Sequence, residues 1–202
     1  ATPAEGYKFV NWTLDGTVLS DDETFVTTVL ADAEYKANFK IKPNKLAIES
    51  VNVNLQPWGD YTEDRIIDAD YSSYFDSNNT QVSGTTVTVT LAEESLVEEV
   101  KLFFTSSASY RPKKAKLQIS NDNATWTDVE GAAFLGADAV DASDVQSAAK
   151  LITVDCNGAV AKYVKMFVTE PAAQWLTIYE FEVYEAPVNV APRTISVSVN
   201  DD

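Results

Sequence analysis

The sequence predicts an all-β protein whose larger part is an antiparallel β-sandwich, or jelly roll, preceded by a small β-rich unit. At least seven short segments alternate apolar and polar residues, and turn residues separate them. No stretch keeps the period of about 3.6 residues that marks a long amphipathic helix. The 202 residues are 45% hydrophobic and 11% aromatic, which is enough apolar material to bury a substantial core. A sandwich of short antiparallel strands fits these observations.

The segment Tyr110–Val129 carries the strongest local pattern. Ala115, Leu117 and Ile119 alternate with polar residues, as expected of a strand with one buried and one solvated face. Asn121-Asp122-Asn123 follows, and such side chains favour turns because they hydrogen-bond to their own backbone. The segment is therefore predicted to be a β-hairpin.

The rest of the larger unit is predicted from the same alternation. Its further strands are 51–55, 85–91, 100–104, 151–156, 162–168 and 177–184. The glutamates within 93–99 are predicted to form a solvated turn, and Val145–Lys150 a short helical turn. Residues 56–80 are polar and aromatic without periodicity, which predicts a long loop. Long ordered loops commonly carry ligand-binding residues.

Residues 1–40 are predicted to form a separate small β unit. Asp15-Gly16 lies between apolar runs and indicates a hairpin. The pattern G-Y-x-F-x-x-W…A-x-F, formed by Gly6, Tyr7, Phe9, Trp12, Ala37 and Phe39, resembles the internalin-type B-repeat of Listeria and Bacteroides surface proteins, without the first strand expected of such a repeat. Tyr7, Phe9 and Trp12 form either an exposed stripe or the core of this unit, and its small size favours the core.

These patterns predict a three-part organisation. Residues 1–42 form the partial repeat, 43–186 the sandwich, and 187–202 a linker or the start of a next module, with a linker around Lys42-Pro43-Asn44-Lys45. Because Ala1-Thr2-Pro3 falls inside a domain, we expect the segment to belong to a longer polypeptide.

Composition excludes several classes of function. Thirty-one acidic against fifteen basic residues give a net charge of −16, which excludes nucleic acid as a favoured partner and favours neutral ligands or divalent cations. No run of about eighteen apolar residues is present, so no membrane insertion is predicted. The absence of histidine excludes Ser-His-Asp and Cys-His sites. The single cysteine, Cys156, lies in an apolar-alternating run and is predicted to be a buried small side chain.

Four motifs occur in one order along residues 67–184. They are Ile67-Asp68-Ala69-Asp70, Ser120-x-Asp122-x-x-x-Trp126, Ala161–Lys165 with the sequence AKYVK, and Ile178–Tyr184 with the sequence IYEFEVY. Together they resemble the discoidin or coagulation factor 5/8 type C family, whose bacterial members include many carbohydrate-binding modules. The resemblance implies a galactose-binding-domain-like sandwich in a secreted or cell-surface bacterial protein, such as a glycoside hydrolase or an adhesin.

The resemblance implies a non-catalytic module that binds a glycan, most simply a neutral one. Sugars present a flat apolar face and a ring of hydroxyls, so a site needs aromatic platforms and polar partners. The candidate platforms are Trp58, Tyr61, Tyr110 and Trp175, and the candidate hydrogen-bonding residues are Asp76, Asn78, Asn79 and Arg111. Galactose-binding members often carry a His and an Arg where Phe75-Asp76 and Thr105–Ser107 stand here, so galactose itself is not implied.

Two alternative functions are also considered for this sequence, a spacer and a hydrolase. A structural or protein-binding spacer would have Trp58 and Trp175 buried or far apart. A hydrolase would need two acids facing each other at about 5–10 Å, and no acidic motif indicates such a pair. We therefore predict that the segment is not an enzyme.

A structural Ca²⁺ is predicted under the loop after the first strand. Asp68, Asp70 and Ser73 offer an oxygen-rich turn, and the resemblance implies that the glutamate opening the closing strand, Glu180, completes the site. Ala69 replaces the glycine usual in the turn and is strained if its φ is positive. Alternatively, Asp68 only caps the turn through its backbone.

Overall fold

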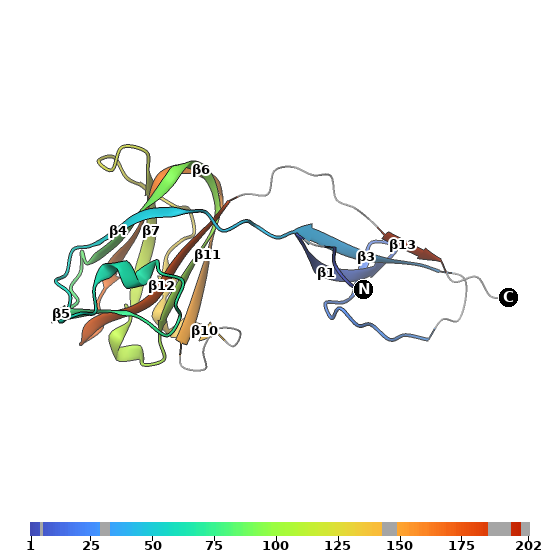
Figure 1. The fold of residues 1–202 in the computed structure, drawn as a ribbon. Helices are drawn as coiled ribbons and strands as arrows, with labels where there is room; N and C mark the ends of the chain where they lie inside the picture. The colour runs from blue at the N-terminus through green and yellow to red at the C-terminus, as the bar shows by residue number, and fades with distance from the viewer. Residues whose placement is uncertain (5, 29–32, 143–148, 186–194, 199–202) are drawn as a thin grey trace. The chain divides into compact units, whose positions relative to one another are not determined.

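The computed structural model describes residues 1–4, 6–28, 33–142, 149–185 and 195–198. The chain divides into two compact units, which are residues 44–186 and residues 1–43 with 187–202 (Figure 1). Among the described residues, no helix has the length and apolar character needed to cross a membrane.

The larger unit is a β-sandwich, as predicted. Short 3₁₀ turns lie at Glu63–Ile66, Ala108–Tyr110 and Gly136–Asp138. The strands are β4 (Ile48–Val53), β5 (Phe75–Thr80), β6 (Thr86–Thr105), β7 (Lys114–Ser120), β8 (Thr127–Asp128), β9 (Phe134–Leu135), β10 (Val140–Asp141), β11 (Ala149–Glu170) and β12 (Trp175–Glu185).

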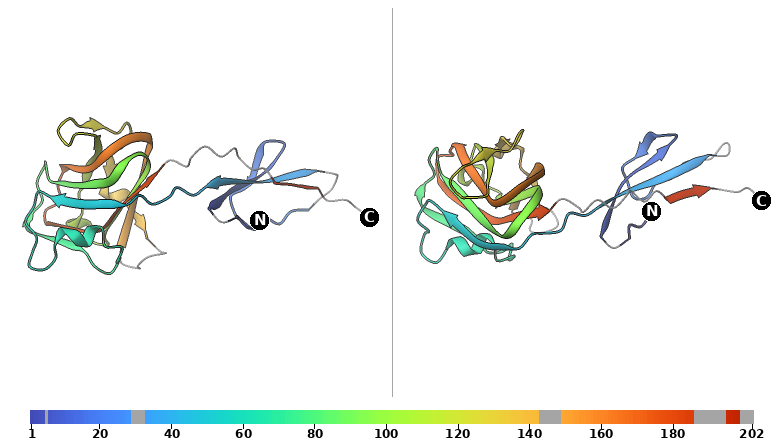
Figure 2. Two further views of the ribbon diagram at one scale, coloured as in Figure 1. Left: turned by 45° about the horizontal axis from the view of Figure 1, so that its top comes forward. Right: turned by 90° about the horizontal axis from the view of Figure 1, so that it is seen from above.

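Two long strands, β6 and β11, take part in both layers of the sandwich (Figure 2). In one layer β4 pairs with residues 86–91 of β6, which pair with β11 and then β7. In the other layer β5, β12, the second half of β6, the first half of β11 and β10 lie in that order. Hydrogen bonding is therefore continuous around the fold, and a single folded sheet encloses the core.

The prediction of a solvated turn within residues 93–99 is wrong. Residues 86–105 form one strand, and the ribbon bends where its register with β11 shifts between Asp155 and Ala159. Asn157 and Gly158 have positive φ values of 53° and 68°, so the irregular backbone lies in β11. Such bulges let a strand pass from one sheet to the other without a turn.

The core lies between the two layers and is mainly aliphatic. Val87, Val89 and Leu91 point inward from one layer, and Leu102 and Phe104 from the other, all essentially without solvent exposure. Burial of each such side chain contributes about 1.5–3 kcal/mol to folding. Cys156 is buried, and burial raises the pKa of its thiol to about 12, which fits its predicted role as a small apolar side chain.

The predicted hairpin is confirmed. Strand β7 pairs with β8, and Asn123 at the turn has a φ of 57°. The Asp122 carboxylate accepts hydrogen bonds from the backbone N–H groups of Thr125 and Ala124 at 2.7 and 2.9 Å, and these bonds hold its pKa well below its usual range. The turn is thus fixed by the side chain that the sequence motif places there.

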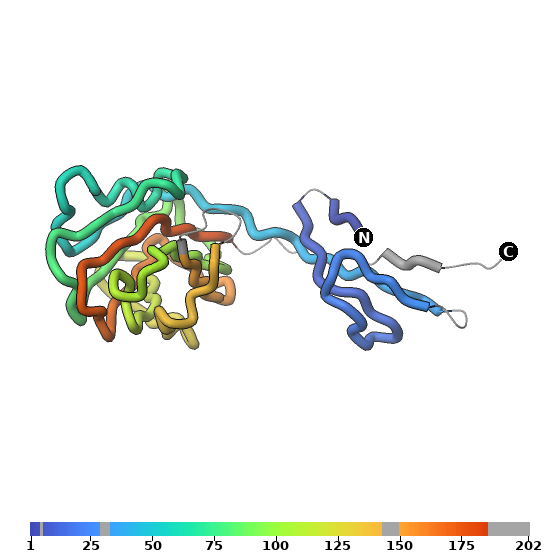
Figure 3. Tube along the Cα trace, turned by 90° about the horizontal axis from the view of Figure 1, so that it is seen from below, coloured from blue at the N-terminus to red at the C-terminus, as the bar shows by residue number. Residues whose placement is uncertain are grey.

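The smaller unit is a four-stranded sheet in the order β13, β3, β1, β2. Its strands are β1 (Tyr7–Leu14), β2 (Thr17–Ser20), β3 (Glu34–Ile41) and β13 (Ile195–Ser198), and Figure 3 traces the chain through both units. Asp15 and Gly16 have φ values of 49° and 81°, as a two-residue hairpin turn requires. Phe9 packs against Trp12 and Phe39 at ring separations of 6.0 and 5.9 Å, so these aromatic residues pack as a core.

Of the C-terminal segment 187–202, predicted as a linker or the start of a next module, residues 195–198 are described, and they form β13. Residues 195–198 pair antiparallel with β3, with Ile195 opposite Ala37. The edge of β3 offers unpaired backbone groups, and residues 195–198 pair with them. Of the predicted helical turn at 145–150, residues 145–148 lie outside the described residues, and Lys150 belongs to β11.

Candidate functional site

A loop after β4 holds the first aromatic residue of the candidate site. The loop runs beside β5, because Trp58 N–H donates to the carbonyl of Asp76 at 2.8 Å and Asn78 N–H donates to the carbonyl of Gln56 at 2.7 Å. Pro57 and Ser77 form an isolated antiparallel bridge between these bonds. The backbone pairing therefore fixes Trp58 next to the start of β5.

The second aromatic residue opens β12. The register between β12 and β5 shifts between Trp175 and Thr177, and the residue between them, Leu176, donates its N–H to the Ser77 hydroxyl at 2.8 Å. Such an irregularity re-aims the neighbouring side chain. Leu176 is completely buried, whereas Trp175 is directed toward solvent.

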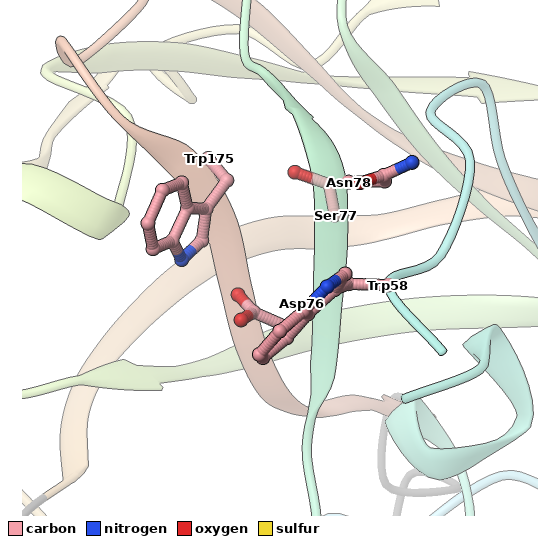
Figure 4. A pocket seen from close by; sticks show the side chains of 5 residues that line it. All are labelled: Trp58, Asp76, Ser77, Asn78 and Trp175. Atoms are coloured by element: carbon pink, nitrogen blue, oxygen red, sulfur yellow. The ribbon is translucent and has the colours of Figure 1, made fainter. Parts of the chain in front are cut away.

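These two tryptophans stand on opposite sides of one cleft, which we call the Trp58–Trp175 cleft. It has a volume of about 260 Å³ and is lined by Trp58, Asp76, Ser77, Asn78 and Trp175. Figure 4 shows the Asp76 carboxylate between the two indole rings. Trp58 and Trp175 are 57% and 38% exposed, respectively. The arrangement expected of a spacer, with these residues buried or far apart, is not observed.

The Asp76 side chain gives the cleft its charge. It is only 7% exposed, and its Oδ1 accepts a hydrogen bond from the Thr177 hydroxyl at 2.6 Å. Burial raises the pKa of Asp76, and the Thr177 bond partly offsets this effect by stabilising the ionised form. No Lys or Arg of the described residues forms an ion pair with Asp76, and none lines the cleft.

Tyr61 and Tyr110, two of the predicted platforms, each contact one of the tryptophans and do not line the cleft. Tyr61 stacks on Trp58 with ring centroids 5.8 Å apart and planes 7° apart. Tyr110 packs against Trp175 at 5.2 Å with its ring tilted by 45°. Each tryptophan is therefore held by a second aromatic ring, which reduces the entropy lost when a ligand is bound.

Arg111 and Asn79 do not line the cleft. Arg111 is buried, and its guanidinium donates to the carbonyls of Gly136, Thr105 and Ser106 at 2.7 to 2.9 Å, so its hydrogen bonds organise the neighbouring loops. Asn79 is exposed, and its carbonyl accepts the Ser77 hydroxyl at 2.7 Å. Arg111 therefore gives the loops three of its five N–H donors, and its predicted ligand-binding role is not one that the Trp58–Trp175 cleft supports.

Ser77 and Thr177 position the cleft, and neither was predicted from the sequence. Both hydroxyls join β5 to the start of β12, one through the Leu176 backbone and the other through Asp76. The alternation of residues 177–184 indicates the face of a strand but not which residue of another strand lies opposite. No signal in the sequence would have identified this pairing.

The turn proposed for Ca²⁺ has the expected backbone. Ala69 has a φ of 61°, the positive value that a glycine would adopt without strain. Asp68 accepts hydrogen bonds from Asp70 N–H at 2.8 Å and from the Ser73 hydroxyl at 2.6 Å. Asp70 accepts the backbone N–H and hydroxyl of Ser72, so its carboxylate is engaged within the turn.

Two buried glutamates of β12 differ in how their charges are satisfied. Glu182 accepts hydrogen bonds from Lys45 Nζ at 2.7 Å, from the Tyr184 hydroxyl at 2.7 Å, and from the Tyr71 hydroxyl. Glu180 is completely buried, and neither of its carboxylate oxygens has a hydrogen-bond partner among the described residues. Glu180 therefore has two uncompensated oxygens.

Glu180 lies against a cavity beneath the turn. The cavity has a volume of about 400 Å³ and is lined by Glu180, Lys45, Ala69 and apolar neighbours. Burial raises the pKa of Glu180 to about 8, Lys45 opposes this shift, and the adjacent Asp68 carboxyl adds to it. Among the described residues, no three acidic, His or Cys side chains converge on one point. A calcium site would thus use Asp68 and Glu180 with backbone carbonyls, which the chemistry of Ca²⁺ permits.

Comparison with family models identifies the sandwich. The model of the F5/8 type C domain matches residues 47–181, which span the cleft and the acidic turn. The chain belongs to the F5/8 type C family. The model of the divergent InlB B-repeat domain matches residues 1–43, in agreement with the repeat inferred from the aromatic pattern. No curated protein sequence matches the chain.

Several solved structures share the fold of this F5/8 type C chain. CBM32-1 from a family 31 glycoside hydrolase of Clostridium perfringens is 19% identical, with a TM-score of 0.54, over 67% of this chain and 93% of that one. The structure of CBM32-1 and CBM32-2 of C. perfringens ZmpB in complex with GalNAc is 14% identical, with a TM-score of 0.56, over 70% of this chain and 36% of that one. Chitosan-binding module 1 from a chitosanase/glucanase of Paenibacillus sp. IK-5 is 22% identical, with a TM-score of 0.54, over 71% of this chain and 99% of that one. At these identities the similarity shows a common fold.

Proposed function

We propose that the F5/8 type C unit is a non-catalytic carbohydrate-binding module that holds its ligand in the Trp58–Trp175 cleft. The observation that carries the proposal is the position of two exposed indoles on either side of one cleft with a carboxylate between them. Indole faces pack against the apolar face of a sugar ring, and a carboxylate accepts hydrogen bonds from its hydroxyls. The size of the cleft, about 260 Å³, suits one or two sugar rings.

The charge of the cleft selects against acidic sugars. Asp76 contributes a negative charge, no described cation lines the cleft, and the whole chain carries −16. A uronate or sulfate group would meet repulsion in a partly desolvated site, where charges are weakly screened. The expected ligand is therefore a glycan without negative charge.

The lining also supports a binding role over hydrolysis. Glycoside hydrolysis needs two carboxyl groups, about 5–10 Å apart, as acid and nucleophile or base. Asp76 is the one carboxylate among the residues that line the cleft in the described part of the chain. The module would then contribute affinity for a glycan surface to other domains of its polypeptide.

The expected setting is a larger secreted or cell-surface bacterial protein. Relatives with the same fold are described as modules of a family 31 glycoside hydrolase and of a protein that also contains an M60 catalytic domain. The B-repeat match in residues 1–43 adds a second module to the same chain. Both observations support a multidomain parent that acts outside the cell.

Glycan-array screening followed by isothermal titration calorimetry tests the proposal. Trp58→Ala and Trp175→Ala should each weaken binding of the best glycan at least about tenfold, which corresponds to about 1.4 kcal/mol. Trp126→Ala serves as the control, because Trp126 packs under Lys165 Nζ, 3.6 Å from its ring centroid, and does not line the cleft. Absence of binding to every neutral and amino glycan at millimolar concentration would refute the proposal.

We also propose that the acidic turn holds a structural Ca²⁺. The two unpaired oxygens of the buried Glu180 support this assignment, because a buried carboxylate needs a compensating charge. Asp68 and Glu180 would hold the ion, which would supply positive charge and link the turn to β12. Asp70 and Ser73 would keep Asp68 oriented within the turn.

A further inference from the structure

The Asp76 carboxylate is buried and forms no ion pair with a Lys or Arg of the described residues. It is 7% exposed, and the Thr177 hydroxyl is the hydrogen-bond donor that the described residues give to its side chain. Desolvating a carboxylate is costly unless an opposite charge or several donors compensate for it. Glu182 of β12, in contrast, has an ammonium group and two phenols as partners. Asp76 is therefore left with an oxygen, Oδ2, that a ligand can use.

The two tryptophans favour the same kind of ligand as the carboxylate. The face of an indole ring carries negative electrostatic potential and attracts a cation placed over it. Trp58 and Trp175 both line the cleft around Asp76, and their supporting rings, Tyr61 and Tyr110, hold them in place. An ammonium group in this cleft would meet two indoles and one carboxylate. It also carries three donors and no acceptor, which suits an acceptor-only carboxylate.

The other groups in the cleft do not offer the same interaction. The Ser77 hydroxyl is already engaged in two hydrogen bonds: it donates its hydrogen to the Asn79 carbonyl and accepts a hydrogen bond from Leu176 N–H. Asn78 is exposed at the edge and carries no charge. Within the described residues that line the cleft, Asp76 is thus the group that distinguishes a charged amine from a neutral substituent.

We propose that Asp76 determines specificity in the Trp58–Trp175 cleft and that the preferred ligand is an amino sugar with a free, protonated amine, such as a glucosamine unit. The proposal rests on the proposed carbohydrate-binding function of the same cleft. The amine forms a charge-assisted hydrogen bond to Asp76 Oδ2, and Thr177 holds Oδ1 in place. N-acetylation removes the positive charge and leaves one donor in place of three, so the acetylated sugar loses most of this interaction.

Calorimetry on the full chain with three oligosaccharides of equal length tests this inference. The ligands are a glucosamine oligomer, the corresponding N-acetylglucosamine oligomer and a mannuronate oligomer, at about pH 6, where an ordinary amine is protonated. We expect the glucosamine oligomer to bind at least about tenfold more tightly than its acetylated counterpart. The mannuronate oligomer should bind most weakly.

The decisive variant is Asp76→Asn, which keeps the shape of the side chain and an oxygen that accepts the Thr177 hydroxyl. It should remove the preference for the free amine, so that the free and the acetylated oligomer bind this variant within about twofold of each other. Asp21→Asn is the matched control, because Asp21 is exposed in the other unit and the substitution changes the net charge equally. This control should keep the preference, which excludes a general effect of charge.

The outcomes separate the inference from the proposed function. Equal binding of the free and acetylated oligomers, unchanged by Asp76→Asn, overturns the amine preference while carbohydrate binding in the cleft stands. Loss of the preference in Asp21→Asn as well overturns the role of Asp76, since the effect would then come from net charge. Absence of binding to all three oligomers and to every neutral glycan overturns both proposals. Thermal unfolding of each variant shows whether the protein is folded before its binding is interpreted.

Discussion

Both units of the molecule contain a chain of aromatic rings, but the rings do different things. In the smaller unit, Trp12 contacts Phe9 and Phe25, and Phe25 contacts Tyr35, at centroid distances of 6.0 to 6.5 Å. In the sandwich, Trp58, Tyr61, Tyr74 and Tyr179 contact one another in that order at 4.9 to 5.8 Å. Ring spacing alone does not separate a core from a binding surface.

The difference lies in what else is available to fill the core. In the smaller unit Ala37 is the fully buried hydrophobic side chain of the described residues, so the half-buried rings must themselves exclude water. The sandwich has a core built mainly from Val, Leu and Ile, with Phe75, Phe104 and Phe181. Trp58 and Trp175 are therefore free to remain exposed, where they can meet a ligand. An aromatic residue gains a binding role where the core is complete without it.

The largest expected effect that tests this comparison is loss of a core ring from the smaller unit. Trp12→Ala should lower the free energy of unfolding of that unit by about 3–5 kcal/mol, because a large ring is removed from a core with few other apolar groups. A unit of this size has little stability to lose. Differential scanning calorimetry should show one transition lost and the transition of the sandwich unchanged. Retention of both transitions would contradict the assignment of the rings as a core.

The next effect concerns an ion that should stabilise the sandwich but not the smaller unit. At free Ca²⁺ about 100-fold above its dissociation constant, the ion contributes about 2.7 kcal/mol. EGTA should therefore lower the melting temperature of the sandwich alone. Glu180→Gln should abolish this calcium-dependent difference, whereas Asp70→Asn should keep most of it, because Asp70 is engaged with Ser72. Equal melting temperatures with Ca²⁺ and with EGTA would refute the site.

Trp58→Ala is expected to have a small effect on stability and a large effect on binding. Trp58 is 57% exposed, so Trp58→Ala should change the free energy of unfolding of the sandwich by less than about 1 kcal/mol. The same substitution should weaken glycan binding at least about tenfold. Urea unfolding and calorimetric titration of the same preparation measure both quantities. Strong destabilisation of the sandwich would place Trp58 with the core rings and remove the contrast between the two units.

Local pattern predicted the fold well, and the failures share one cause. The alternation at 85–91 and 100–104 correctly identified two inward faces, Val87 to Leu91 and Leu102 with Phe104. It did not show that the glutamates between them continue the same strand, because the bend depends on the irregular backbone of the partner strand at Asn157 and Gly158. Pairing between distant strands is set by tertiary contacts that a local pattern does not contain.

The same limit applies to the candidate site. Trp58 and Trp175 were predicted from their chemistry and their places at loop and strand ends, and the structure brings both into one cleft. Arg111 had the right chemistry for a sugar ligand, but it does not line the cleft, and its guanidinium donates to the carbonyls of Thr105, Ser106 and Gly136. Ser77 was not predicted, since its importance comes from its position opposite Leu176. Residue type indicates what a side chain can do, and the tertiary fold determines whether it is available.

The smallest effect concerns backbone strain in the turn of the sandwich. Ala69 has a φ of 61°, and an L-residue with a Cβ pays about 1–2 kcal/mol for this conformation. Glycine removes that strain but gains freedom in the unfolded chain, which costs about 0.4–1 kcal/mol. Ala69→Gly should therefore raise the free energy of unfolding of the sandwich by about 0–1.6 kcal/mol and leave the smaller unit unchanged.

The matched control for this substitution is Asn123→Gly in the turn of the Tyr110–Val129 hairpin. Asn123 has nearly the same φ, 57°, but asparagine tolerates the left-handed conformation at little cost. Its replacement relieves less strain while adding the same freedom to the unfolded chain, so it should be neutral or slightly destabilising. Urea unfolding of the two variants under the same calcium concentration compares them directly. If Ala69→Gly gains no more stability than Asn123→Gly, the turn at Ala69 stores no strain.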